Sequence, residues 1–160
     1  MPNIPKPAPS FARPLTGVDL VVFTVRDEQL QILLALRPDI PGEPFPNRWA
    51  LPGGLIDVDE DASLEACARR KLEEKTGVAT PYLEQLGSWG NRKRDPRGWS
   101  VTQAWFALMP SDNVVLSAGA NTTAVRWTKV DGDGVSGRLA FDHAEILTVA
   151  LERLRSKVEY

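Results

Sequence analysis

One stretch of the sequence, residues 52–78, combines two glycines, an acidic loop and a helix-forming segment that ends in a glycine. Glycine lets the backbone come close to a metal ion or a phosphate group, because it has no side chain. On a helix, residues three and four positions apart share one face. Carboxylates on such a face can hold Mg²⁺, which takes oxygen ligands and pairs with substrate phosphates. The spacing therefore points to phosphate chemistry assisted by a divalent cation.

This stretch resembles the motif of the Nudix hydrolase family, G-x5-E-x7-R-E-U-x-E-E-x-G-U, in which U is a bulky apolar residue. The matching residues, from the front half of the motif to the back half, are Gly54, Glu60, Arg70, Leu72, Glu74, Gly77 and Val78. Residues 49–53 also look like the family's lead-in. The resemblance implies the Nudix fold, an α+β arrangement in which a mixed β-sheet is packed between helices as an α/β/α sandwich. It also implies Mg²⁺- or Mn²⁺-dependent attack of water on a pyrophosphate.

Two positions of the motif carry the opposite charge in this chain. Counted back from Gly77, the family's first helix glutamate falls at Lys71 and its last at Lys75. Of the three carboxylates that the resemblance assigns to metal binding, Glu74 alone is present. A divalent cation on this face would meet two ammonium groups, which should sharply lower the affinity for Mg²⁺.

The front half of the motif is also displaced. Two more residues separate Gly54 from Arg70 than the family pattern allows. If the helix sets the register, Ala62 takes the place that Glu60 otherwise fills. The resemblance implies Glu74 and Arg70 as catalytic residues, and Glu74, Glu60 and the Gly54 carbonyl as metal ligands.

Two functional interpretations of the altered motif stay open. In the first, nearby acids build a displaced metal site and the lysines help to neutralise a pyrophosphate. The candidate acids are Asp57, Asp59, Glu60, Glu65 and Glu73. In the second, Lys71 and Lys75 bind phosphate and no efficient hydrolysis occurs. A structural alternative is that both lysines only make local pairs and that Glu74 pairs with Arg70, four residues earlier.

Candidate ligand-binding residues also lie outside the motif. Arg37 closes a predicted strand, where a fixed guanidinium can grip phosphate with two hydrogen bonds. Arg94 and Arg97 bracket a basic loop, for which a merely solvated loop is the alternative. Trp49 is a candidate to stack on adenine, although most of the five tryptophans should serve the core. His143, the only histidine, opens the last predicted helix, and the resemblance favours a place near the pocket.

The elements that must position these residues follow from hydrophobic periodicity. Residues 18–25, which are largely apolar and β-branched, and the apolar residues 30–36 predict two strands that pair antiparallel across a polar turn. A helix is expected after them, with Asp61 or Ser63 as its N-cap and Gly77 at its end. Further expected elements are strands at residues 49–51, 82–89, 99–109 and 122–130, and a closing helix at residues 141–157.

Composition limits the class of protein. A chain of 160 residues, 42% hydrophobic and 25% charged, suits one globular domain. The single cysteine, Cys67, rules out an intramolecular disulfide and a cysteine-rich zinc site. Without a long apolar run or a secretion signal, we expect a cytoplasmic protein with no membrane contact. Residues 1–16 are rich in proline and predict a flexible arm, and residues 17–160 predict the Nudix domain.

The resemblance extends beyond the motif to one Nudix branch, which contains ADP-ribose pyrophosphatases and the Nudix-related transcriptional regulators of NAD metabolism. Residues 91–99, 104–108 and 139–143 carry this part of it. It implies a nucleoside diphosphate linked to another group, with ADP-ribose first, as the small-molecule ligand, and leaves a homodimer open. In those regulators a winged-helix domain follows the Nudix domain. Because the chain stops near that point, and because its net charge is −2, no direct nucleic-acid binding is expected.

The sequence thus favours a Nudix pyrophosphohydrolase that acts on ADP-ribose and is weak or inactive because Lys71 and Lys75 replace motif glutamates. The alternative is a sensor module that binds ADP-ribose or a similar nucleotide without hydrolysing it efficiently. A structural relic of the family is the third interpretation.

Overall fold

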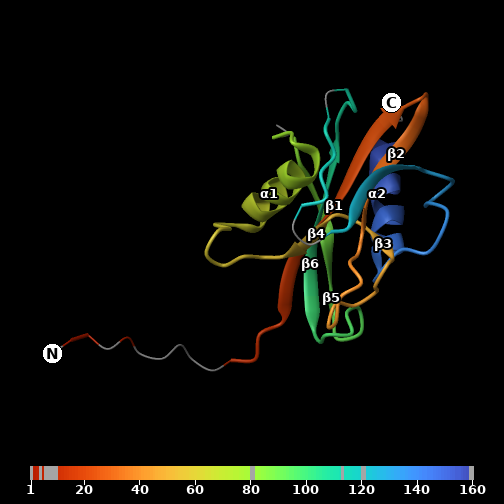
Figure 1. Cartoon of the computed structure of the whole chain (residues 1–160). Helices are drawn as coiled ribbons and strands as arrows, with labels where there is room; N and C mark the ends of the chain where they lie inside the picture. The colour runs from red at the N-terminus through yellow and green to blue at the C-terminus, as the bar shows by residue number, and fades with distance from the viewer. Residues whose placement is uncertain are drawn as a thin grey trace.

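The computed structural model describes residues 2–3, 5, 11–79, 82–112, 114–119 and 122–158. A mixed β-sheet lies between two helices, with α1 (Leu64–Thr76) on one face and α2 (His143–Val158) on the other (Figure 1). This is the predicted α/β/α sandwich. The predicted proline-rich arm falls partly on residues outside the described ranges.

The sheet is organised around β1 (Leu15–Arg26), which is buried over most of its length. It pairs antiparallel with β2 (Gln29–Leu36), as predicted, and parallel with β6 (Ser100–Leu108). β1 begins two residues before the predicted domain start at Gly17, because Leu15 and Thr16 already pair with β6. The remaining strands are β3 (Trp49–Ala50) and β7 (Ala124–Lys129) beside β2, β4 (Gly53–Leu55) beside β1, and β5 (Glu84–Asn91) beside β6.

Successive side chains of β1 enter two separate cores, because neighbouring residues of a strand point to opposite faces. Val22 packs in one hydrophobic cluster with Leu72 and Cys67 of α1. Phe23 packs in the other with Ile146 of α2. A strand that is covered on both faces has no polar side to show to water, which explains why β1 reads as a nearly continuous apolar run.

The ends of α1 follow local sequence signals. The Ser63 hydroxyl accepts a hydrogen bond from the backbone N–H of Ala66 at 3.0 Å and caps the helix. Gly77 adopts the left-handed conformation at φ +69° and donates its N–H to the Glu73 carbonyl. Of the two predicted caps, Ser63 is therefore the one used. In the described residues, neither α1 nor α2 is long and apolar enough to cross a membrane.

β4 is an element that the sequence did not predict, since glycines are uncommon inside strands. Gly53 and Gly54 instead pair with Asp19 and Val18 of β1. A Cβ atom on Gly53 would lie 2.1 Å from the Val18 carbonyl oxygen, so no larger residue fits there. The glycines thus bring the start of the motif against the central strand.

Candidate functional site

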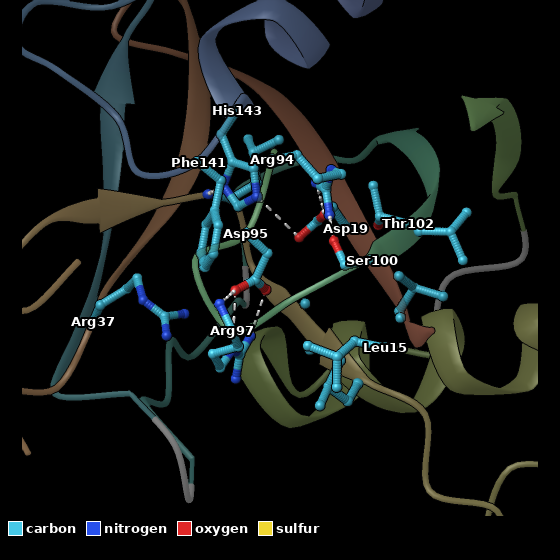
Figure 2. Close-up of a pocket in the computed structure, with 17 residues that line it drawn as sticks. Leu15, Asp19, Arg37, Arg94, Asp95, Arg97, Ser100, Thr102, Phe141 and His143 are labelled. Carbon is cyan, nitrogen blue, oxygen red and sulfur yellow. Dashed lines mark hydrogen bonds and ion pairs between the residues drawn. The ribbon is translucent and has the colours of Figure 1, made fainter. Parts of the chain in front are cut away.

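A pocket opens between β1, β4, the loop that joins β5 to β6 and the residues that lead into α2 (Figure 2). The parallel pairing of β1 with β6 brings that loop beside the start of β1. The ionisable side chains that line the pocket are Asp19, Arg37, Arg94, Asp95, Arg97 and His143. Two groups of contacts hold them.

The first group is centred on Arg94, whose side chain is only 7% exposed. Its Nε and Nη2 atoms donate to the two carboxylate oxygens of Asp142 at 2.9 and 2.7 Å, and its Nη1 donates to the Ser100 hydroxyl at 2.8 Å. Nη2 also lies 3.9 Å from Asp19. Burial works to lower the pKa of Arg94, but the surrounding carboxylates, Asp142 first and then Asp19 and Asp95, together outweigh it and raise that pKa. Arg94 therefore ties α2 to the floor of the pocket.

His143 completes this group. Its Nδ1 accepts a hydrogen bond from the backbone N–H of Leu51 at 2.9 Å, so Nε2 carries the hydrogen and faces Asp19 Oδ1 at 3.3 Å. The imidazole is 3% exposed and has both nitrogens engaged. Its contacts orient the Asp19 carboxylate, which is itself buried at the pocket wall.

The second group surrounds Glu43. Arg37 donates to the Pro44 carbonyl at 2.7 Å and to Glu43 Oε2 at 2.9 Å. Arg97 grips both oxygens of Asp95 at 3.2 and 2.9 Å, and its Nη1 lies 4.0 Å from the same Glu43 oxygen. Burial lowers the pKa of Arg37. Burial works to raise the pKa of Asp95, but its hydrogen bonds with Arg97 prevail and lower it. Two guanidinium groups thus converge on one carboxylate oxygen.

Between the two groups lies Phe141, which adopts a left-handed backbone at φ +51°. Its ring is 4.7 Å from that of Phe45, and the Arg37 guanidinium lies 4.8 Å from its centre. Such a backbone is unusual for a bulky residue and indicates local strain. At the wall formed by β6, Thr102 Oγ1 is buried and makes no hydrogen bond within the described part of the chain. A buried hydroxyl without a partner at a pocket favours a polar ligand.

The motif helix forms a separate network. Arg70 donates to both oxygens of Asp61 at 2.7 and 2.8 Å and to Glu74 at 2.9 Å. The hydrogen bond from Arg70 holds the pKa of Asp61 well below its usual range. The two predicted catalytic residues, Arg70 and Glu74, therefore pair with each other, and neither lines the pocket. Asp61, predicted as an alternative cap, is the main partner of Arg70.

Oxygen donors for a divalent cation are not assembled on this helix. In the ranges that the structure describes, no three histidine, cysteine, aspartate or glutamate side chains form a group that could hold a metal ion. Glu60 is exposed on the preceding loop, where its backbone N–H bonds to Asp57. The Glu74 carboxylate is paired with Arg70. The residues present therefore do not fit a divalent cation at the position that the resemblance implies.

The predicted ligand-binding residues divide into two sets. Those that line the pocket are Arg37, Arg94, Arg97 and His143, together with the predicted metal ligand Gly54. Trp49, Lys71 and Lys75 do not line it. The ring of Trp49 is covered by the Arg126 guanidinium at 3.9 Å. The Lys75 amine is buried and bonds to the Ala118 carbonyl and to Thr122. Lys71 lies beside Gly54 at the edge of the pocket.

Sequence reasoning missed Asp19, Glu43, Thr102 and Phe141. Asp19 had a visible signal, because it is a lone charge inside the apolar run that became β1. Phe141 lies in residues 139–143, which carry part of the resemblance, but its place at the pocket depends on the backbone turn that precedes α2 and was not predicted. Asp142, the residue before α2, pairs through its side chain with Arg94.

Known proteins resemble the chain over nearly its whole length. A sequence model described as NUDIX domain matches residues 15–148. The ADPR responsive transcriptional repressor NtrR of Acinetobacter baylyi is 44% identical over 150 residues, which cover 94% of this chain and 58% of the repressor. The ADP-ribose pyrophosphatase of Methanocaldococcus jannaschii is 26% identical over 137 residues, which cover 86% of this chain and 73% of the enzyme. The chain thus spans less than two thirds of the repressor's length.

Two solved structures share the fold at comparable identity. The NUDIX domain of Shewanella oneidensis NrtR complexed with ADP ribose is 42% identical, with a TM-score of 0.77 and 90% of each chain covered. Shewanella oneidensis NrtR complexed with a 27mer DNA is 43% identical, with a TM-score of 0.77, 89% of this chain covered and 63% of the other.

These relatives contradict the expectation of no direct nucleic-acid binding. One is a transcriptional repressor, and another was solved with DNA bound. The expectation relied on the net charge and on where the sequence stops. Neither is a sound basis, because DNA binding depends on a local basic surface and these relatives extend beyond the matched region. The predicted relationship to ADP-ribose pyrophosphatases and to the Nudix-related regulators is confirmed.

Proposed function

The chain belongs to the Nudix family, and from that premise we propose that its pocket binds a nucleoside diphosphate linked to a second group, with ADP-ribose as the ligand. The observation that carries the proposal is the convergence of Arg37 and Arg97 on a single oxygen of Glu43. An anionic oxygen already occupies the point between the two guanidinium groups. A diphosphate offers oxygens of the same kind with more charge, and guanidinium groups bind phosphate oxygens through paired hydrogen bonds.

Other pocket groups suit the remaining parts of such a ligand. The buried Asp19 carboxylate is an acceptor for sugar hydroxyls, and the Thr102 hydroxyl has an unused hydrogen-bonding capacity. The aromatic ring of Phe141 offers an apolar surface beside Arg37. The relative solved with ADP ribose, at 42% identity, supports the same ligand class.

Pyrophosphate hydrolysis is the reaction that we propose for this site, at a low rate. Members of the family generally use divalent metals such as Mg²⁺ or Mn²⁺, which shield phosphate charge and activate water. Here Lys71 and Lys75 stand at two of the acidic positions, and Glu74 is bound by Arg70. With one paired carboxylate in place of three free ones, we expect cleavage to be much slower than binding.

We propose a second function, regulation, because of the repressor at 44% identity. In this hypothesis the domain senses ADP-ribose, and the bound state changes how the protein contacts DNA. Binding without rapid cleavage suits such a role, because a sensor must hold its ligand long enough for the bound state to be read.

One assay tests the proposal and ranks the two functions. The protein is incubated with ADP-ribose and Mg²⁺ or Mn²⁺ while AMP release and the thermal shift are followed together. We expect a clear shift with little AMP, and a smaller shift for Arg97→Met, because that substitution removes one of the converging guanidinium groups. Rapid AMP release that Glu74→Gln abolishes would favour the enzyme over the sensor. No shift and no AMP across a panel of nucleoside diphosphates would contradict the ligand assignment.

Two further predictions from the sequence remain proposals. We propose a homodimer, which sedimentation of the purified protein would test. We also propose a cytoplasmic location, which fractionation of cells that produce the protein would test.

A further inference from the structure

The two lysines on α1 that stand at acidic motif positions have different surroundings. Lys75 is 4% exposed. Its amine donates to Thr122 Oγ1 at 2.8 Å and to the Ala118 carbonyl, and its own backbone carbonyl accepts from Ser117. Lys75 therefore fastens the segment before β7 to the end of α1. Its charge is already used inside the fold and is not available to a ligand.

Lys71 lies one helical turn earlier and is half-buried. A Cβ atom built on Gly54 would lie 3.3 Å from Lys71 Nζ and 3.4 Å from its Cε. The amine is therefore against the backbone of a residue that lines the pocket. Gly54 has a φ of +151°, a backbone conformation that favours glycine. Because this position of β4 carries no side chain, there is room beside it for the Lys71 amine.

Two acids near this part of α1, one in the preceding loop and one on the helix, are taken by another cation. Asp61 and Glu74 both bind Arg70. Within the described residues, the Lys71 amine has no hydrogen bond and no ion pair of its own. A half-buried ammonium without a counter-ion is costly, and an anionic ligand in the adjacent pocket would remove that cost.

We propose that the Lys71 ammonium contacts the diphosphate and supplies the positive charge that a divalent cation supplies at this place in other members of the family. Nucleotide binding by this chain then does not require a divalent cation. The inference rests on the proposed function, because it assumes that the pocket binds a nucleoside diphosphate. An ammonium group is a point charge that neutralises a phosphate oxygen, but it does not lower the pKa of a water molecule as a bound metal ion does. A lysine in place of the motif glutamate at position 71 therefore preserves nucleotide binding but does not supply the water activation that a bound metal ion would supply.

Calorimetric titration of ADP-ribose into the whole chain tests this inference, once with EDTA and once with Mg²⁺. We expect the wild-type dissociation constants to agree within about twofold. Lys71→Met should weaken binding about tenfold in both buffers, because a charge-assisted contact is lost without loss of helix propensity. The matched control is Lys129→Met, which removes the same charge at the exposed end of β7, outside the pocket lining. It should leave both constants unchanged.

Lys71→Glu supplies the opposite arm of the test. It should bind poorly in EDTA, because a carboxylate then faces the diphosphate, and it should regain affinity when Mg²⁺ is added. Thermal melts without ligand show whether each variant is folded. Wild-type binding that disappears in EDTA, or binding by folded Lys71→Met equal to wild type, would overturn the inference while leaving the proposed function intact. No binding by the wild type in either buffer would refute both.

Discussion

The pocket wall and the motif helix use the same charged residue types with different results. In the pocket, Arg94 and Asp142 bind each other across two elements, and Arg37 and Arg97 converge on Glu43. On the helix, Arg70 binds Asp61 and Glu74 within one element and its preceding loop. The pocket is thus lined by arginine side chains of a kind that suits an anion, whereas the Glu74 carboxylate on the helix is occupied by Arg70. The charged groups of the pocket wall and those of the motif helix are held by separate ion pairs, so a sequence can alter one set and keep the other.

The largest effect is expected from removing the cation at the floor of the pocket. Arg94→Met should lower the free energy of unfolding by about 3–5 kcal/mol, because it leaves Asp142 and Asp19 close together without their cation. Urea denaturation measures the change. A loss below about 1 kcal/mol would mean that solvent already screens these carboxylates. The ion pair of Arg94 would then contribute no more to stability than an exposed pair on the motif helix.

The two lysines on α1 provide the next test, since their surroundings differ while their charges are equal. Lys75→Glu should destabilise the fold by about 3 kcal/mol, because a carboxylate would be buried against the Ala118 carbonyl in place of the amine. Lys71→Glu should change stability by less than about 1 kcal/mol, since that side chain is only half-buried. Equal losses in thermal or urea unfolding would contradict the distinction between a structural and an available lysine.

The pairing of Asp61 with Arg70 predicts a dependence of stability on pH. The pKa of Asp61 is depressed in the fold, so its contribution to stability is complete well above the usual aspartate pKa of about 4 and is lost progressively as the pH falls from there toward the lowered pKa. Asp61→Asn should cost about 2 kcal/mol at pH 7. Urea denaturation should show a smaller difference in stability between the two proteins at pH 3 than at pH 7. A difference that stays constant between the two pH values would mean that Asp61 acts through neutral contacts.

Sequence reasoning succeeded where the signal is local. Ser63 caps α1 and Gly77 ends it through contacts within four residues along the chain. β1 and β2 were found because a strand covered on both faces must be apolar throughout. The positions of Lys71 and Lys75 in the motif followed from counting back from Gly77.

The remaining features depend on contacts between distant segments. Which lysine is buried was not predictable, because the partners of Lys75, Ala118 and Thr122, lie 43 and 47 residues further along the chain. The same holds for the partner of Arg94, which is 48 residues away. Arginines could be recognised as candidates for phosphate binding, but whether each binds a ligand or an internal carboxylate is decided by tertiary packing.

Glu43 offers the most sensitive test of the pocket, with the smallest expected effect. Its carboxylate oxygen is 2.9 Å from Arg37 and 4.0 Å from Arg97, and the side chain is 36% exposed. An anionic ligand between these guanidinium groups must displace that carboxylate, so the ion pairs that Glu43 makes oppose binding. Glu43→Gln keeps the size of the side chain and removes its charge. It should strengthen ADP-ribose binding by roughly threefold to fivefold, a gain that corresponds to the loss of a partly exposed ion pair. Calorimetric titration at low and high salt measures this gain, which should shrink as salt screens the pair. Weaker binding by Glu43→Gln would mean that Glu43 positions the arginines for the ligand and does not compete with it.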